Sequence, residues 1–226
     1  MRLLLIRHGQ TPHNVTGALD TAHPGAGLTA LGRAQAAAVP AAIAGEEVSA
    51  VYASALVRTQ LTAAPLADAL GMDVRVRDGL EEVTAGSLEL RSDKEAVHAY
   101  VGCLADWMRG DLDRTVPGGV TGHDFHRRYD RALRSIAGDH SARDTVVVFS
   151  HGAAIRVYTA LAAGLDPEVS TELRIMNTGM SVLEGDPTTG WQLAAWSSEP
   201  LGGLDLEDRL ANDTTGESAE EAVHEA

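Results

Sequence analysis

The chain opens with residues 1–11, which read MRLLLIRHGQT. Five of the first six residues are apolar, and such a run is typical of a strand buried on both faces of a parallel sheet. The run ends in Arg7, His8 and Gly9, at the carboxyl end of the predicted strand, where α/β proteins usually carry their binding residues. An arginine fork matches phosphate oxygens, a histidine can act as a nucleophile, and a glycine lets the backbone approach a ligand. By itself the stretch also fits a buried strand that ends in a polar turn without a functional role. The rest of the chain distinguishes these two interpretations.

Strand and helix patterns then alternate along the chain. Residues 48–53 and 144–150 are apolar runs of strand length, and residues 73–77 alternate in polarity. Between them the sequence predicts a helix that is capped by Thr29 and stopped or kinked by Pro40, and a helix from Ala55 to Gly71. This βαβ rhythm predicts an α/β fold, a three-layer α/β/α sandwich with a mostly parallel sheet. Because βαβ connections are right-handed, we expect the ends of the first two strands, and with them His8 and Arg58, to meet at one edge.

Other segments depart from this rhythm. Residues 179–184 and 191–196 predict an antiparallel hairpin at the sheet edge. Residues 86–128, with a helix expected over 93–108, are interpreted as a helical insert that lies over the strand ends. We expect one domain over residues 1–203. Residues 204–226 are acidic and lack apolar periodicity, which predicts a disordered tail.

Composition narrows the classes of function. The formal net charge of −14 argues against nucleic acid or an anionic membrane as a partner. Cys103 is the single cysteine, so no disulfide forms within the chain, which fits a reducing compartment. Arg7 and His8 interrupt the first apolar run too early for a signal peptide, and no stretch is long enough to span a bilayer. We therefore expect a cytoplasmic protein.

The polar residues at the predicted strand ends form one set. Two arginines, two histidines, one amide and one carboxylate are expected on a single rim: Arg7, Arg58, His8, His151, Asn14 and Glu82. Such a set suits a pocket that binds a phosphate dianion, in which the carboxyl group of Glu82 is available for proton transfer.

The order of these residues resembles the histidine phosphatase superfamily, which includes the cofactor-dependent phosphoglycerate mutases. The resemblance covers about residues 1–198 and rests on six motifs. These are Arg7-His8-Gly9, the stretch from Leu28 to Ala36, Ser54 followed by Arg58, Leu80-Glu81-Glu82, Ser150-His151-Gly152, and Asn177 before the hairpin.

The resemblance implies that His8 attacks phosphorus and carries the phosphoryl group on its ring. It implies that Glu82 protonates the leaving oxygen and then accepts a proton from water. Glu81 is the alternative acid, and the family spacing of Leu, one residue, then Glu favours Glu82.

The resemblance also implies the ligands of the phosphate. These are Arg7, Asn14, Arg58 and a protonated His151, aided by the dipole of the helix that follows Ser150. We further expect substrate contacts from Thr16, Gly17 and Gly152. The arginines would supply the charge that a metal supplies elsewhere, so we expect no metal and no cofactor. The spacing of His123 and His126 raises zinc as an alternative, but the sequence shows no further ligand cluster beside them.

We expect a phosphomonoesterase that acts on a small phosphorylated metabolite. A phosphoglycerate mutase is the first alternative, which the short insert and its few basic residues disfavour. An inactive phosphate-binding or scaffold protein is the second, which the presence of His8, Arg58, Glu82 and His151 disfavours. Glu89 is followed by Leu90 where the family carries a glycine, so the insert departs from the family pattern and the substrate stays open. The terminal hairpin could support a homodimer.

Overall fold

The computed structural model describes residues 1–218, and residues 219–226 of the predicted tail lie outside the described part. Its centre is a six-stranded sheet in the order β3-β2-β4-β1-β5-β6. The first four strands of this order are mutually parallel, whereas β5 and β6 are antiparallel to their neighbours. The strands are β1 Arg2–Arg7, β2 Val48–Ala53, β3 Val74–Val76, β4 Thr145–Ser150, β5 Met180–Asp186 and β6 Gly190–Ser197. The predicted α/β class and the antiparallel edge hairpin are confirmed.

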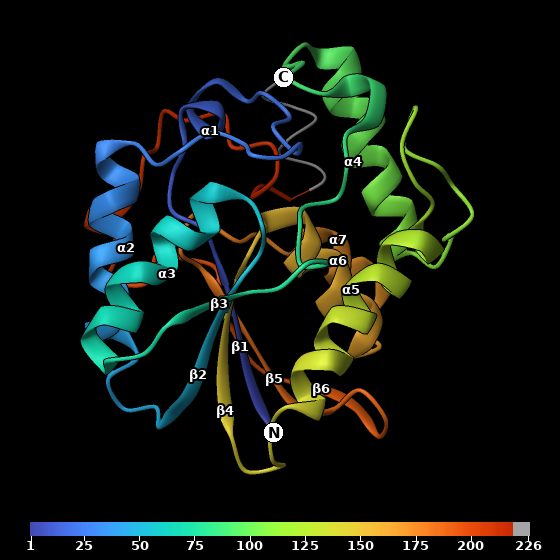
Figure 1. The fold of residues 1–226 in the computed structure, drawn as a ribbon. Coiled ribbons are helices and arrows are strands. Elements are labelled where there is room, and N and C mark those ends of the chain that lie inside the picture. Colours follow the sequence, from blue (N-terminus) through green and yellow to red (C-terminus); the bar gives the residue numbers. More distant parts are fainter. Residues whose placement is uncertain (219–226) are drawn as a thin grey trace.

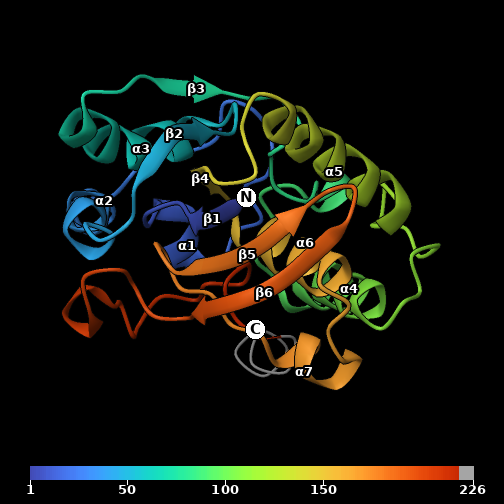
Figure 2. The same cartoon turned by 90° about the horizontal axis from the view of Figure 1, so that it is seen from below.

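Helices cover both faces of the sheet (Figures 1 and 2). The helices α2 (Ala30–Ala42) and α3 (Val57–Leu70) pack on one face. The other face carries α4 (Lys94–Met108), α5 (Gly122–Gly138), α6 (Gly152–Ala162) and α7 (Pro167–Glu172). The short helix α1 (Pro12–Thr16) follows the end of β1.

The strand pattern explains the two cores. In β1, Leu3 and Leu5 point to one face and Leu4 and Ile6 to the other, and all four are buried. The larger core joins the sheet to α4, α5 and α6, and the smaller one joins it to α2 and α3. Because successive strand residues face opposite sides, a strand buried on both faces must be apolar throughout.

Several local predictions were wrong in detail. The helix α2 continues through Pro40 to Ala42, and because only two residues follow the proline, its missing amide donor affects only the last turn. The helix α3 begins at Val57 rather than Ala55. The helices α1 and α7 were not predicted, because each is only five or six residues long, which is too short for a periodic apolar pattern.

The segment after Gly203 differs most from its prediction. Residues 204–206 form a 3₁₀ turn, and residues 207–218 run back over the carboxyl ends of the strands. Asn212 donates its amide to Val15, and Gly216 accepts a hydrogen bond from the amide of Ile175. The predicted disorder therefore does not describe residues 204–218.

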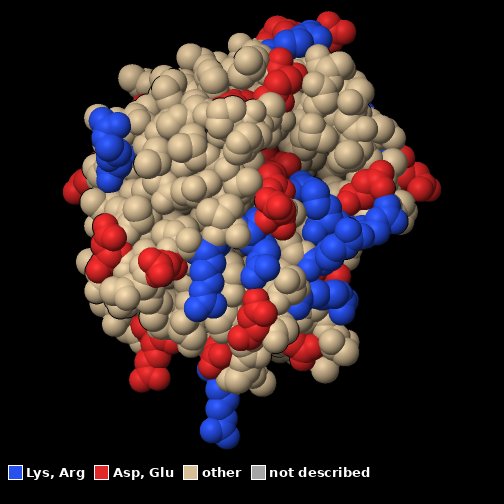
Figure 3. Space-filling model, viewed as in Figure 1, with Lys and Arg blue, Asp and Glu red and all other residues tan. Residues whose placement is uncertain are grey.

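Charge is unevenly distributed over the surface. On the face shown in Figure 3, basic side chains gather over α5, whose arginines are Arg127, Arg128, Arg131 and Arg134. No helix within residues 1–218 is long and apolar enough to cross a membrane.

Candidate active site

A small pocket opens at the carboxyl end of β1. Its lining comes from three sequence regions and from the C-terminal segment: His8, Thr11, His13, Asn14, Ala18, Asp20, Arg58, Glu82 and Thr215. The free volume inside is about 10 Å³, which is about the space of one water. The structure thus brings His8 and Asn14 together with Arg58 and Glu82, which lie on two other segments of the chain.

His8 is held with one ring nitrogen free. Its Nδ1 lies 2.8 Å from the carbonyl oxygen of Gly9, which can only accept, so Nδ1 carries the proton and Nε2 keeps its lone pair. Burial, Arg58 and Arg7 together hold the pKa of His8 well below its ordinary value of 6.5. His8 is therefore a neutral imidazole near neutral pH, the form that a nucleophile requires.

Glu82 lies at the N-terminus of α6. Its carboxylate accepts hydrogen bonds from the amides of Val83, Ala153 and Ala154, at 2.8–3.2 Å. Burial raises the pKa of Glu82, although these amides and Arg58 oppose the shift. A carboxyl group with a raised pKa can hold a proton and give it up near the operating pH. The helix dipole that we expected to face phosphate is thus directed at Glu82 instead.

The loop that carries Glu82 is fixed by two neighbours. Ser150, at the end of β4, donates to the carbonyl oxygen of Leu80 at 2.8 Å. Arg128 donates to the carbonyl oxygens of Glu81 and Glu82 at 3.0 Å and also pairs with the Glu81 carboxylate. Glu81 therefore belongs to an ion pair on α5, outside the pocket that His8 lines.

Arg58 is held by an aspartate that the sequence analysis did not identify. Its Nη2 donates to the carbonyl oxygen of Asp20 at 2.9 Å, and its Nη1 lies 3.5 Å from the Asp20 carboxylate. The same carboxylate lies 2.9 Å from Nδ1 of His13. Asp20 and His13 were missed because each lies in a short irregular stretch with no motif of its own.

His151 faces His8, with ring centroids 5.3 Å apart. Nε of Arg58 donates to its Nδ1 at 3.3 Å, so its Nε2 carries the proton and donates to Ser54 Oγ at 2.7 Å. Burial, Arg58 and His8 lower the pKa of His151 well below 6.5. The lowered pKa favours the neutral ring of His151 rather than the protonated ring that we expected. A phosphate dianion beside the ring would raise this pKa.

Arg7 and Asn14 meet a partner from the far end of the chain. Arg7 is fully buried and forms a two-pronged ion pair with Asp213, with Nη2 at 2.5 Å from Oδ1. Asn14 donates its Nδ2 to the same carboxylate at 3.0 Å. Asp213 was missed because it lies in the acidic segment interpreted as disordered.

The three expected substrate contacts are not exposed in the pocket. Thr16 is exposed on the last turn of α1 and does not line the pocket. Gly17 lies beneath the C-terminal segment, where its carbonyl accepts a hydrogen bond from Thr214. Gly152 begins α6 next to Thr215, and a Cβ at Gly152 would lie 2.5 Å from the Thr215 carbonyl oxygen.

Comparison with known proteins identifies the family. The family model of the histidine phosphatase superfamily (branch 1) matches residues 3–199. The chain belongs to this superfamily. The six motifs lie within the matched range, whereas Asp213 and Thr215 lie beyond its end.

Several proteins similar to this chain are informative. A mycobacterial glucosyl-3-phosphoglycerate phosphatase superposes with a TM-score of 0.74 at 25% identity, over 88% of this chain and 99% of that one. A probable phosphoglycerate mutase GpmB of Yersinia enterocolitica is 27% identical over 89% of this chain and 93% of its own length. The PE-PGRS family protein PE_PGRS11 of Mycobacterium tuberculosis is 35% identical over 91% of this chain, which spans only 38% of that protein.

Proposed function

We propose that this histidine phosphatase hydrolyses a small phosphorylated metabolite through a phosphohistidine on His8. The observation that carries the proposal is the neutral His8 ring, with Nε2 unprotonated, in one pocket with Arg58 and Glu82. These three groups are a nucleophile, a fixed positive charge and a proton donor, which are the parts that phosphoryl transfer needs.

The proposed reaction has two steps. In the first, Nε2 of His8 forms a bond to phosphorus, the bond from phosphorus to the ester oxygen breaks, and Glu82 protonates the leaving oxygen. In the second, water attacks the phosphohistidine, the P–N bond breaks, and Glu82 takes the proton of that water. Arg58 stabilises the charge on the phosphoryl oxygens in both steps.

The proposed reaction needs no metal, because guanidinium groups supply the positive charge. Arg7 and Asn14 would join Arg58 at the phosphate once Asp213 has left them. A mutase would use the same first step but return the phosphoryl group to a second substrate hydroxyl instead of to water.

The test is phosphate release from a panel of phosphomonoesters in the presence of EDTA. The panel includes glucosyl-3-phosphoglycerate and phosphoserine, for which two phosphatases of similar structure are named, and 3-phosphoglycerate, which one of them binds. The wild type is compared with His8→Ala and with His123→Ala, which alters an exposed histidine on α5. Release that is lost only in His8→Ala supports the proposal. Isomerisation of 3-phosphoglycerate with little free phosphate would instead establish a mutase.

A further inference from the structure

The C-terminal segment, residues 207–218, covers the groups that should hold phosphate. Asp213 occupies both terminal nitrogens of Arg7 and the only donor group of the Asn14 side chain. The Asn14 Oδ1 is also used, because it accepts hydrogen bonds from Thr11 and Asn177. Two of the expected phosphate ligands are therefore satisfied by a carboxylate of the same chain.

The same segment also closes the pocket. Thr215 lines the pocket beside His8 and accepts a hydrogen bond from Nη2 of Arg7 at 3.0 Å. With about 10 Å³ of free space, the pocket holds about one water and not a phosphoryl group of several heavy atoms. Movement of this part of the chain would make room for a substrate.

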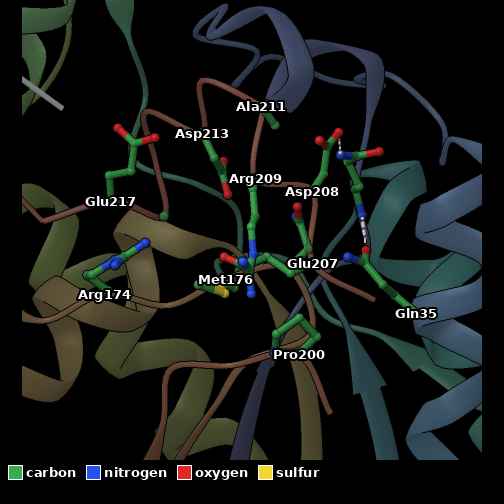
Figure 4. Close-up of a pocket in the computed structure, with 13 residues that line it drawn as sticks. Gln35, Arg174, Met176, Pro200, Glu207, Asp208, Arg209, Ala211, Asp213 and Glu217 are labelled. Carbon is green, nitrogen blue, oxygen red and sulfur yellow. Dashed lines mark hydrogen bonds and ion pairs between the residues drawn. The ribbon is translucent and has the colours of Figure 1, made fainter. Parts of the chain in front are cut away.

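Polar contacts, not an apolar core, hold the segment in place. Its buried residues are Thr214, Gly216 and Ser218, and no apolar side chain of residues 207–218 is buried. Figure 4 shows Glu207, Asp208, Arg209 and Asp213 around a pocket, and Gln10 donates to Asp208 at 2.8 Å. This pocket, about 140 Å³ in volume, lies between the segment and the body of the domain. Segments with few buried apolar contacts open at low free-energy cost.

A second guanidinium lies beneath the segment. Arg156 on α6 is buried, and its Nη1 reaches the Thr215 carbonyl oxygen only at 3.5 Å, while its Nε has no partner among the described residues. Nε of Arg7 is likewise buried without a partner there. The surface under the segment thus keeps spare donors for an anion even while Asp213 is bound.

From these contacts we infer that residues 207–218 are an autoinhibitory strap, in which the Asp213 carboxylate competes with substrate phosphate for Arg7 and Asn14. The inference rests on the proposed phosphatase function of the same site. Opening of the strap precedes binding, so the observed affinity for phosphate equals the affinity of the open form multiplied by the fraction of open molecules. Any interaction that captures the acidic strap would raise the activity.

Binding of inorganic phosphate, measured by titration calorimetry, tests the inference without turnover. Asp213→Asn keeps the side-chain shape but removes the charge, and we expect it to bind phosphate about tenfold more tightly than the wild type. Asp205→Asn removes the same charge from an exposed position of the preceding turn and is expected to leave the affinity unchanged. Equal or weaker binding by Asp213→Asn would show that Asp213 positions Arg7 rather than competing with phosphate.

Hydrogen exchange on the wild type gives an independent measurement. Two amide hydrogen bonds join the strap to the domain: Ile175 donates to Gly216 of the strap, and Asn212 of the strap donates to Val15. Saturating phosphate should speed hydrogen exchange at both amides. Amides of β1 serve as the reference. Slower exchange at Ile175 and Asn212 would mean that the segment closes over phosphate, and the inference would fail. Tighter phosphate binding by Asp213→Asn with no hydrolysis of any ester would support the strap while contradicting the proposed function.

Discussion

Replacing Glu82 with glutamine separates its role as an acid from its role as a helix cap. The carboxylate accepts three amide hydrogen bonds, the longest of them from Ala153 at 3.2 Å. A carboxamide turns one acceptor into a donor, so the amide of Ala153 loses its partner at a cost of about 1–3 kcal/mol. Removing a buried charge offsets part of this cost, because burial raises the pKa of Glu82. We therefore expect a folded variant with a free energy of unfolding within about 2 kcal/mol of the wild type.

The catalytic effect should depend on the leaving group. An alkyl alcohol needs a proton to leave, so Glu82→Gln should lower kcat for an alkyl phosphate by about 10²–10⁴. 4-Nitrophenolate leaves without a proton, so 4-nitrophenyl phosphate should still phosphorylate His8. The water that hydrolyses the phosphohistidine then lacks its base, and the intermediate should accumulate.

The assay is rapid mixing of each ester with the variant. We expect a burst of 4-nitrophenolate equal to the enzyme concentration, followed by slow turnover, and no burst with the alkyl phosphate. Glu81→Gln is the matched control, because that side chain pairs with Arg128 outside the pocket, and its kcat should change less than about threefold. An equal loss for both esters, or a larger effect from Glu81→Gln, would refute the role given to Glu82.

Three further predictions concern the nucleophile, the pH profile and the insert. His8→Ala should abolish both turnover and acid-labile labelling of the protein by a ³²P-ester; labelling that persists would place the intermediate elsewhere. The profile of kcat/KM against pH should be bell-shaped. The midpoint of its rising limb lies below pH 6.5, because His8 loses its proton at a lowered pKa. The midpoint of its falling limb lies above pH 4.5, because Glu82 loses its proton at a raised pKa. A rising limb above pH 6.5 in stopped assays would contradict this assignment. Leu90 has a φ of +61° and is 57% exposed. Leu90→Gly should relieve about 1–2 kcal/mol of backbone strain and lose about 0.5–1 kcal/mol to backbone entropy. The denaturant midpoint should therefore rise slightly, and a clearly lower midpoint would contradict this prediction.

Much of the sheet and of the site could be predicted from the sequence. The strands β1, β2 and β4 are buried on both faces, so their apolar runs are continuous and easy to recognise. The motifs around His8, Arg58, Glu82 and His151 are local, and parallel strands bring their carboxyl ends to one edge whatever the intervening loops do. Short elements such as α1 lacked the length that a periodic signal needs.

The sequence alone thus determined the α/β architecture and the set of catalytic candidates. Buried parallel strands require continuous apolar runs, and the polar motifs directly follow these runs. The tertiary structure alone decided which charges meet. Asp20 reaches Arg58, Glu82 reaches the amides that begin α6, and Asp213 reaches Arg7 across 206 positions of sequence. In each pairing the carboxylate lies on an irregular segment. Coulomb attraction depends on distance in space, which a periodic sequence pattern does not report.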